Sequence, residues 1–340
     1  MMMMRAVIFD GQKNHIQEVP IPKVSDTQVL IKVKAVGICG TDFAITNGDL
    51  PSTTPIILGH EFSGEIVKIG KDVDHYWLGK RVTSEINSNI DFNCYYCQRG
   101  IYTQCISRKA IGIDMDGALA EYIAVESYLI HEIPENLSFE EATFIEPLAA
   151  AYQAFEMMPL NQDDKNIAIF GLGKLGLLIL QVAKSQDLNI IAIDGSELKL
   201  NLAKKLGAKH LINRFKVNNI SKEIKSLTNG LGADIVVDST GVATVFKEII
   251  ASCRTRGKIH VKSTHGIDTP INLTDIVVRE ITLYSSRCGP FELAIKGLKS
   301  GDIIVKDLIS DIISFKDVEK NIFGKKPSRD IIKIVVRIED

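Results

Sequence analysis

The sequence predicts an α/β protein of two domains, in which a β-rich half precedes a doubly wound parallel sheet. Three observations lead to this fold class. The chain has 340 residues, and at about 150 residues per domain this length corresponds to about two domains. Up to residue 146, short apolar runs are separated by Gly, Pro, Asn and Asp, as in all-β domains. From residue 147, apolar strands alternate with longer helical stretches, as in parallel sheets covered by helices.

The composition excludes several classes of protein. Hydrophobic residues make up 45% of the chain and charged residues 24%, and 40 basic residues stand against 42 acidic ones. These values are typical of a globular protein, and they exclude a disordered chain, a collagen and a membrane span. Nucleic acid is an unfavoured partner because the net charge of −2 provides no basic surface. The apolar stretch at the N-terminus is too short for a signal peptide, so we expect a cytoplasmic protein.

In the β-rich half, residues 1–146, two runs are the clearest strands. Residues 29–36 and 62–69 are rich in Val and Ile and lie between turn-forming residues. We therefore expect this half to be all-β.

The region 147–286 is predicted to form the parallel sheet. Its elements alternate between strand and helix, which is the pattern of consecutive β-α-β units. Strands are expected at 167–170, 190–193, 235–237, 259–261 and 281–284, and helices at 175–184 and 198–206. Residues 213–229 are polar and are interpreted as a solvated helix and loop. A doubly wound unit of six strands accommodates this order.

The last segment, 287–340, is predicted to rejoin the first domain. Its final apolar run, 330–337, is a strand for which the parallel sheet has no position left. A chain that crosses between two domains in this way would leave a cleft between them, which is a common place for a ligand.

A glycine-rich loop follows the predicted strand 167–170 and opens the next helix. Gly171 allows a tight turn, Gly173 lets the backbone approach a pyrophosphate, and Gly176 lets helix and strand pack closely. Lys174 and Leu175 complete the loop, in which the helix N-terminus faces the phosphates. The motif, in this strand-turn-helix context, predicts a dinucleotide-binding site.

The choice of dinucleotide is predicted from Asp194. This residue ends the next strand, 18 residues beyond Gly176. A carboxylate there accepts hydrogen bonds from the ribose diol of NAD and repels the 2′-phosphate of NADP. NAD is therefore favoured over NADP, although a nearby cation such as Lys199 could shift the balance.

The β-rich half carries a sulfur, an imidazole and a carboxylate in two short motifs. These are Cys39-Gly40-Thr41-Asp42 and Gly59-His60-Glu61-x2-Gly64-x5-Gly70-x2-Val73. The second run resembles, position for position, the zinc signature of the medium-chain dehydrogenase/reductase superfamily, in its zinc-dependent alcohol dehydrogenase family. The resemblance covers essentially the whole chain. It implies a GroES-like catalytic domain, a Rossmann cofactor domain and a catalytic zinc ion in the cleft.

The family resemblance also assigns the third zinc ligand. In Glu146-Pro147-Leu148, Glu146 holds the position at which classical alcohol dehydrogenases have Cys. A glutamate there is similar to sorbitol and other polyol dehydrogenases and to sugar dehydrogenases of the glucose dehydrogenase type. The implied zinc ligands are thus Cys39, His60 and Glu146. Glu61 is either a fourth ligand that exchanges with substrate or an acid that contacts the ligand residues and not the zinc ion.

Two further residues take roles from the same resemblance. Asp42 orients His60 and raises its basicity. Thr41 passes a proton from the substrate oxygen toward the cofactor ribose, because a hydroxyl both donates and accepts hydrogen bonds. Many relatives complete this relay with a histidine, but the corresponding position here is Ala44.

A second cluster lies at about 91–105. It reads Asp91-x2-Cys94-x2-Cys97-x7-Cys105, and the structural-zinc lobe of the family has four cysteines at this spacing. Asp91 takes the place of the first cysteine, and aspartate is also a zinc ligand. We expect structural zinc here, with three free thiols as the alternative.

The function expected from these features is zinc-dependent hydride transfer from a secondary alcohol, in a polyol or sugar, to NAD. Within the same fold the alternatives are an L-threonine 3-dehydrogenase and a simple secondary-alcohol dehydrogenase. Alternatives of another class are a zinc-free quinone reductase or binding protein, and a nucleic-acid-binding zinc module. The expected partners are a small-molecule substrate and further copies of the chain, as a homotetramer or dimer, with no membrane partner.

Overall fold

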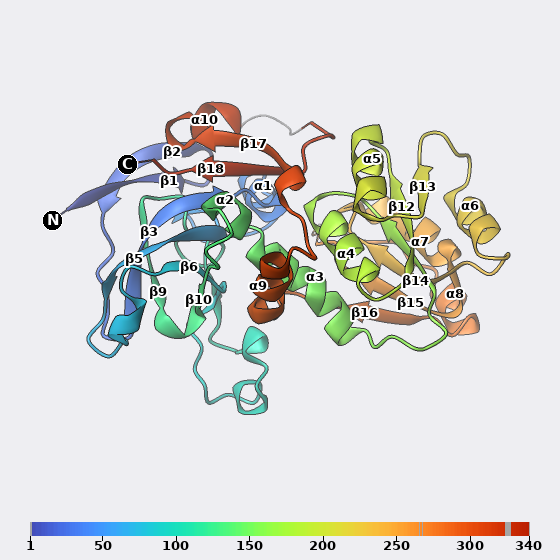
Figure 1. The fold of residues 1–340 in the computed structure, drawn as a ribbon, viewed down its shortest axis with the longest axis horizontal. Coiled ribbons are helices and arrows are strands. Elements are labelled where there is room, and N and C mark those ends of the chain that lie inside the picture. Colours follow the sequence, from blue (N-terminus) through green and yellow to red (C-terminus); the bar gives the residue numbers. More distant parts are fainter. Residues whose placement is uncertain (1, 265, 267, 324–327, 340) are drawn as a thin grey trace. The chain divides into compact units, whose positions relative to one another are not determined.

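The computed structural model describes residues 2–264, 266, 268–323 and 328–339 (Figure 1). The chain divides into two compact units, each built from separated segments. The first unit comprises Met1–Glu146, Val305–Pro327 and Lys333–Asp340. The second comprises Pro147–Ile304 and Ser328–Ile332.

The first unit is built on a seven-stranded sheet. Its strand order is β10-β6-β5-β3-β18-β17, with β9 also paired to β3. The bounds are β3 (Gln28–Gly37), β5 (Glu61–Ile69), β6 (Arg81–Ser84), β9 (Tyr122–Glu126), β10 (Ile130–Glu132), β17 (Ile309–Ser314) and β18 (Lys333–Arg337). A second sheet joins β2 (Asn14–Pro20), β1 (Met3–Phe9) and β4 (Ile56–Ile57), and a short ribbon pairs β7 (Asn87–Ser88) with β8 (Lys109–Ala110). The predicted strands 29–36 and 62–69 lie within β3 and β5, which pair antiparallel.

The expectation that the first half is all-β was wrong, because short helices interrupt it. Helix α1 (Gly40–Thr46) begins directly after Cys39, where the Asp42 carboxylate accepts a hydrogen bond from the Cys39 N–H at 2.8 Å. Helix α2 (Phe139–Ala142) begins with a reciprocal capping box between Ser138 and Glu141. Side chains of this kind satisfy N–H groups that a helix start leaves unpaired. A third short helix, α10 (Val318–Asn321), follows β17.

The second unit contains a six-stranded parallel sheet in the order β13-β12-β11-β14-β15-β16. The bounds are β11 (Asn166–Phe170), β12 (Asn189–Asp194), β13 (His210–Asn213), β14 (Ala233–Asp238), β15 (Cys253–Val261) and β16 (Thr282–Ser285). This order confirms the predicted doubly wound α/β fold. Only β13 lies outside the predicted runs, because it is short and both its ends are polar.

Helices cover both faces of this sheet (Figure 1). Helices that lie wholly or mainly in this unit include α3 (Ile145–Met157), α4 (Lys174–Lys184), α5 (Glu197–Leu206), α6 (Ile220–Leu227), α7 (Phe246–Ser252), α8 (Leu273–Val278) and α9 (Phe291–Ser300). Helices α4 and α5 contact β11, β12 and β13, whereas α7 contacts β14 and β15 and α6 packs on α7. The apolar strand residues and one side of each helix form the core between them.

The return to the first unit begins later than residue 287, the expected boundary. Helix α9 belongs to the second unit, where it buries Phe291, Ala294 and Leu298. It also packs closely on α3: a Cβ at Gly297 would lie 2.5 Å from the Tyr152 hydroxyl. The chain re-enters the first unit at Val305. Its last strand, β18, then lies between β17, to which it is parallel, and β3, to which it is antiparallel.

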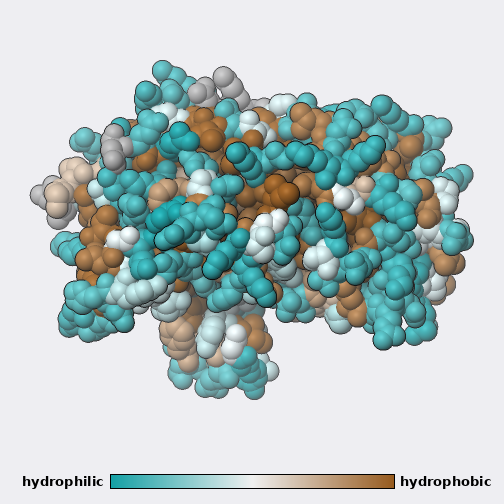
Figure 2. All heavy atoms as spheres, viewed as in Figure 1, coloured by the Kyte–Doolittle hydropathy of each residue, from teal (hydrophilic) through white to brown (hydrophobic). Residues whose placement is uncertain are grey.

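Hydrophilic side chains cover most of the face shown in Figure 2, and apolar residues appear there in separate patches. The large apolar side chains are mainly buried within the two units. In the described part of the chain, no helix has the length and hydropathy that crossing a membrane requires.

Candidate active site

The glycine-rich loop joins β11 to α4. Gly171 has a φ of +88°, and a Cβ there would lie 2.8 Å from the Ser239 carbonyl oxygen. A Cβ at Gly176 would lie 1.9 Å from the Gly171 carbonyl oxygen. Gly173 precedes the first turn of α4 and has open space around it. The turn therefore requires a glycine at position 171, and the close packing requires one at position 176. Gly173 leaves room for a ligand at the start of the helix.

Asp194 ends β12 and lies beside this loop. One carboxylate oxygen accepts a hydrogen bond from the Leu172 N–H at 2.7 Å. The other accepts from the N–H groups of Gly195 and Ser196, at 2.7 and 2.9 Å. The contact with Leu172 places the carboxylate next to the glycine loop, where the ribose adjoining a bound pyrophosphate would lie.

A sulfur, an imidazole and a carboxylate meet in the first unit. One ligand atom each from Cys39, His60 and Glu61 lies within 4.8 Å of the others. Cys39 stands between β3 and α1, and Glu61 is the first residue of β5. His60 and Glu61 are buried. Because β3 and β5 are paired, with Gly37 opposite Glu61, the two motifs meet at the same end of the sheet.

The electrostatics of this group favour a cation. Burial of His60 disfavours the charged form of its imidazole. The neighbouring charges, first that of Cys39 and then that of Asp42, outweigh burial and raise the pKa of His60 to about 10. The Glu61 charge acts in the same direction. The group thus stabilises a positive charge among its members, which a metal ion would also provide.

Asp42 and Thr41 both lie against this group. Asp42 is fully buried, and its Oδ1 lies 3.7 Å from Nδ1 of His60. Its other oxygen accepts from the Cys39 N–H, so a single carboxylate fixes the helix start and faces the imidazole. The Cys39 thiol donates to Thr41 Oγ1 at 3.7 Å. Thr41 is therefore adjacent to the sulfur of the group.

Glu61 is paired with a lysine from the far end of the chain. The Lys333 ammonium group donates to the Glu61 carboxylate, and each residue is 1% exposed. The ammonium also donates to the Thr143 carbonyl oxygen at 3.2 Å and lies 4.7 Å from the centroid of the Phe144 ring. Among the described residues, Glu146 does not join the ligand atoms of Cys39, His60 and Glu61 within 4.8 Å. It lies in the first turn of α3 and is the last residue of the first segment of its unit.

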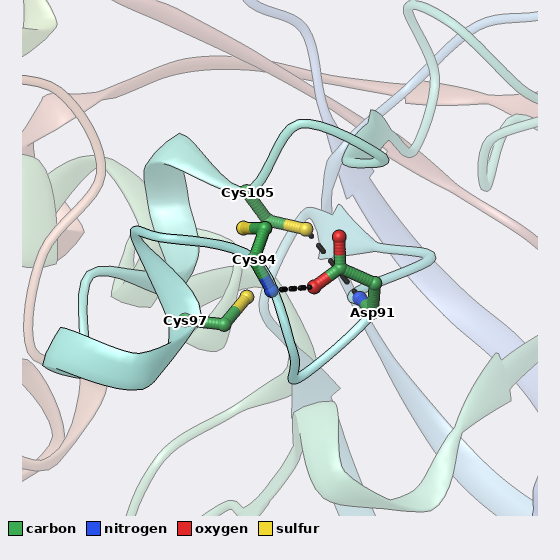
Figure 3. Close-up of side chains that lie close together, drawn as sticks. All are labelled: Asp91, Cys94, Cys97 and Cys105. Atoms are coloured by element: carbon green, nitrogen blue, oxygen red, sulfur yellow. Dashed lines mark hydrogen bonds between the residues drawn. The ribbon is translucent and has the colours of Figure 1, made fainter.

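The second predicted cluster also assembles (Figure 3). Ligand atoms of Asp91, Cys94, Cys97 and Cys105 all lie within 4.8 Å of one another, and the four side chains converge on a common point. Asp91 Oδ1 accepts from the N–H groups of Asn93 and Cys94, both at 2.8 Å. The Asp91 N–H donates to the Cys105 sulfur at 3.4 Å. A turn held by Asp91 therefore brings the first two ligands of the sequence motif together.

The pKa values of two potential ligands in this lobe shift in opposite directions. Hydrogen bonds from the backbone N–H groups of Cys94 and Asn93 hold the pKa of Asp91 below its usual range. Burial raises the pKa of Cys97 to about 12, and the nearby Cys105 thiol adds to this effect. Three sulfur atoms and a carboxylate around one point are the donor set of a tetrahedral zinc site.

Comparison with known proteins identifies the family. The family profile described as "Alcohol dehydrogenase GroES-like domain" matches residues 25–135, and that described as "Zinc-binding dehydrogenase" matches residues 175–299. A sorbitol dehydrogenase of Halalkalibacterium halodurans is 32% identical over 327 residues, which are 94% of each chain. The chain belongs to the zinc-type alcohol dehydrogenase family.

Two other members of this family are similar over most of their length. A D-arabitol-phosphate dehydrogenase of Enterococcus avium is 34% identical, covering 86% of this chain and 85% of its own. A zinc-binding dehydrogenase structure from Sinorhizobium meliloti, bound to NADP, is 29% identical with a TM-score of 0.91, over 99% of this chain and all of its own. The predicted resemblance to this family, with its GroES-like and Rossmann-like parts, is confirmed.

Some polar residues of this zinc-type dehydrogenase were not predicted from the sequence. Lys333 is one, and its signal was a lysine at the start of an otherwise apolar run. His260 and Lys262 are two more, at the carboxyl end of β15 where doubly wound sheets bind ligands. Both are buried, and each lies 3.0 Å from the Ser286 hydroxyl. In the sequence, the available signal was a histidine within the predicted strand 259–261 and a lysine directly after it.

Proposed function

We propose that this dehydrogenase is a zinc-dependent enzyme that transfers a hydride from a secondary alcohol group of a polyol or sugar to NAD. The observation that carries the proposal is the close grouping of a half-buried Cys39 with the buried His60 and Glu61, which favours a cation. The relatives named sorbitol dehydrogenase and D-arabitol-phosphate dehydrogenase support the polyol class. The assembled ligand group does not favour the zinc-free alternatives.

The residues that would hold the catalytic zinc are Cys39, His60 and Glu146. A thiolate and a carboxylate neutralise a divalent ion, and the fourth position stays open for substrate. When bound, zinc supplies Lewis acidity, which lowers the pKa of an alcohol hydroxyl. Glu61 already has a charged partner, because it forms a buried ion pair with Lys333. We therefore propose that Glu61 lies next to the ligand residues and does not itself bind the zinc ion.

The proton of the substrate hydroxyl would leave through Thr41. Its Oγ1 lies beside the Cys39 sulfur and can accept one proton while donating another. Asp42 keeps His60 and the start of α1 in place during this transfer. Because Ala44 has no titratable group, the proton would pass from Thr41 to the cofactor ribose and then to water.

The dinucleotide would bind the second unit through its glycine loop. Gly173, Lys174 and Leu175 at the start of α4 present N–H groups to the pyrophosphate. Asp194 would accept hydrogen bonds from the adenosine ribose diol, which favours NAD. NAD, when bound, supplies the hydride acceptor.

The lobe of Asp91, Cys94, Cys97 and Cys105 would hold a second, structural zinc ion. Four protein ligands leave no open position, which is typical of structural rather than catalytic sites. None of the six cysteines, all of which the structure describes, forms a disulfide, which fits a protein of the reducing cytoplasm.

The protein would form a homodimer or tetramer. In the described part of the second unit, β16 pairs with only one neighbour and forms an edge of the sheet. Leu283 on this strand and Val277 and Val278 on α8 are exposed apolar side chains. An exposed edge of this kind can pair with a second copy. Light scattering coupled to gel filtration gives the assembly size.

A substrate panel tests the proposal. NAD reduction is measured with sorbitol, arabitol, their phosphates, aldoses, L-threonine and 2-butanol, and zinc is determined in the same sample. We expect the highest kcat/KM for a polyol or its phosphate. Turnover of L-threonine or 2-butanol alone would establish one of the alternatives within the family. A zinc-free sample without turnover on any alcohol would contradict the proposal.

A further inference from the structure

Two polar side chains meet where the last two strands of the parallel sheet end. Strands β15 and β16 are neighbours, with Val261 opposite Ser285. Lys262 and Ser286 are the next residues along the chain from each of them. The Lys262 ammonium group donates to the carbonyl oxygen and to the hydroxyl of Ser286, both at 3.0 Å. The lysine is only 8% exposed, which is rare for this residue type.

His260 joins the same hydroxyl group. Its side chain is fully buried, and its Nε2 lies 3.0 Å from Ser286 Oγ. Because an ammonium group only donates, the hydroxyl is left to donate to Nε2, and the imidazole keeps its proton on Nδ1. Burial, reinforced by the charge of Lys262, lowers the pKa of His260 to about 4. The positive charge of this group of three residues therefore lies on Lys262.

This group of Lys262, Ser286 and His260 is not explained by folding stability. The two oxygens of Ser286 are neutral, so they hold the ammonium group without cancelling its charge. Among the described residues, Nδ1 of His260 has no hydrogen-bond partner, and a buried donor left unpaired is destabilising. Buried strands of parallel sheets are normally apolar. Polar groups that break such a pattern are expected at functional sites.

The group lies on the side of the glycine loop that is opposite to Asp194. Asp194 ends β12 on one side of β11, whereas β14, β15 and β16 follow one another on the other side. At the end of β14, the Ser239 hydroxyl donates to the Gly171 carbonyl oxygen of the loop at 2.8 Å. The Lys262 N–H donates to the Asp238 carbonyl oxygen at 2.9 Å, so the ends of β14 and β15 adjoin.

This placement indicates which half of a dinucleotide the group would meet. Dinucleotides lie across the point at which the strand order reverses, which is here between β11 and β14. If the adenosine ribose lies at Asp194 and the pyrophosphate at the glycine loop, the nicotinamide half extends over the ends of β14, β15 and β16. Lys262 stands at the end of β15 and therefore on the nicotinamide side.

We propose that the positive charge of Lys262 makes this site bind reduced nicotinamide more tightly than oxidised nicotinamide. This inference rests on the proposed dinucleotide site. The nicotinamide ring is positively charged in NAD and becomes neutral when it accepts the hydride of the alcohol. A nearby ammonium group repels the charged ring but not the neutral one, and the repulsion is stronger where protein excludes water than in bulk water.

The consequence concerns the direction of the reaction. Because the repulsion is relieved when the hydride arrives, Lys262 favours transfer from the alcohol to NAD over the reverse transfer. It also favours tight binding of the product NADH. Ser286 is the positioning residue, since it holds the ammonium group through two hydrogen bonds.

Binding of three ligands to the full-length protein, without an alcohol substrate, tests the inference. NADH is titrated by fluorescence, and NAD and ADP-ribose are titrated by calorimetry. In Lys262→Met, the ratio of the Kd of NAD to the Kd of NADH should fall at least about fivefold, chiefly because NAD binds more tightly. ADP-ribose contains the pyrophosphate but no nicotinamide, so its Kd should stay within about threefold of wild type.

Four further variants separate charge from structure. Lys262→Arg keeps the charge, so its ratio should stay within about threefold of wild type. Lys247→Met removes an exposed positive charge from the same unit and should leave all three affinities unchanged. Ser286→Ala removes one of the two acceptors of the ammonium group, so the ratio should fall, but by less than in Lys262→Met. If thermal unfolding shows that Lys262→Met does not fold, Lys262→Gln replaces it with the same expected result.

The inference is overturned if Lys262→Met binds ADP-ribose normally and keeps the wild-type ratio of the two Kd values. Equal loss of all three ligands in this variant would also overturn it, because Lys262 would then act on the phosphates or on the fold. Failure of the wild-type protein to bind any of the three ligands would overturn the dinucleotide site itself, and the inference with it.

Discussion

The Lys333 ammonium group pairs with the Glu61 carboxylate inside the first unit, although the two residues are 272 positions apart in the sequence. The pair spans three adjacent strands, because β18 lies next to β3 and β3 lies next to β5. It ties the last strand of the chain to the group of Cys39, His60 and Glu61. A buried ion pair of this kind is costly to break from one side, since the remaining charge has no partner.

Lys333→Met tests this pair. The variant leaves the Glu61 carboxylate buried beside the Cys39 thiol, and we expect a loss of about 3–5 kcal/mol in the free energy of unfolding. Urea unfolding can be followed through Trp77, the single tryptophan, which lies in the first unit. Lys306→Met, at an exposed lysine, is the control. The double variant Lys333→Met/Glu61→Gln should recover at least half of the loss. A single variant as stable as the control would show that the pair contributes nothing.

Gly37→Ala should disturb the same pair sterically. A Cβ at this position would lie 2.1 Å from Nζ and 2.2 Å from Cε of Lys333. Because the lysine is enclosed, we expect a loss of about 1–3 kcal/mol in stability. Gly40→Ala is the control, since a Cβ there has nothing within 4 Å and lies in the first turn of α1. The control should be neutral or slightly stabilising. Equal stability of the two variants would mean that Lys333 moves aside freely.

Cys97→Ala tests the structural-zinc lobe. We expect the zinc content to fall by about one ion per chain, because a tetrahedral site loses one of its four ligands. NADH binding should be unchanged, since the glycine loop belongs to the other unit. Metal analysis after dialysis measures the first effect and fluorescence titration the second. Cys288→Ala, outside both clusters, should keep the full zinc content. An unchanged zinc content in Cys97→Ala would support the alternative of three free thiols.

Asp194→Ala should relax the choice of cofactor. The variant loses hydrogen bonds to the ribose diol and the repulsion of a 2′-phosphate, so the NADH affinity should fall about tenfold while that for NADPH rises. Glu197→Ala is the control, because it removes a nearby carboxylate that is paired with Lys216. Fluorescence titrations with both cofactors give the ratio. The same preference before and after the Asp194 change would remove this residue from the ribose contact.

The parallel sheet was the part of the fold most readily predicted from the sequence. Its inner strands β11, β12 and β14 are buried along most of their length and read as continuous apolar runs, and the glycine loop marks where β11 ends. The boundary at 287 was not predictable, because α9 is amphipathic and belongs to the second unit through long-range packing, such as that of Gly297 on Tyr152. Helix α1 was missed because its start depends on a capping interaction between Cys39 and Asp42 rather than on apolar periodicity.

In the candidate sites, too, residues in short motifs were predicted from the sequence, whereas residues brought together from distant parts of the chain were not. Ligands in short motifs, such as Cys94 and Cys97, were predicted from spacing, and the structure brings them together. Lys333 was not predicted, because nothing local in the sequence indicates that β18 lies beside β3.

The most direct test of the account is the zinc content and turnover of Cys39→Ser and His60→Ala, measured together with NADH binding. The account predicts that each variant loses about one zinc ion per chain and all measurable NAD reduction. The NADH affinity should stay within about threefold of wild type, because the glycine loop lies in the other unit. A variant that keeps both its zinc and its turnover would contradict the assignment of the metal to these residues.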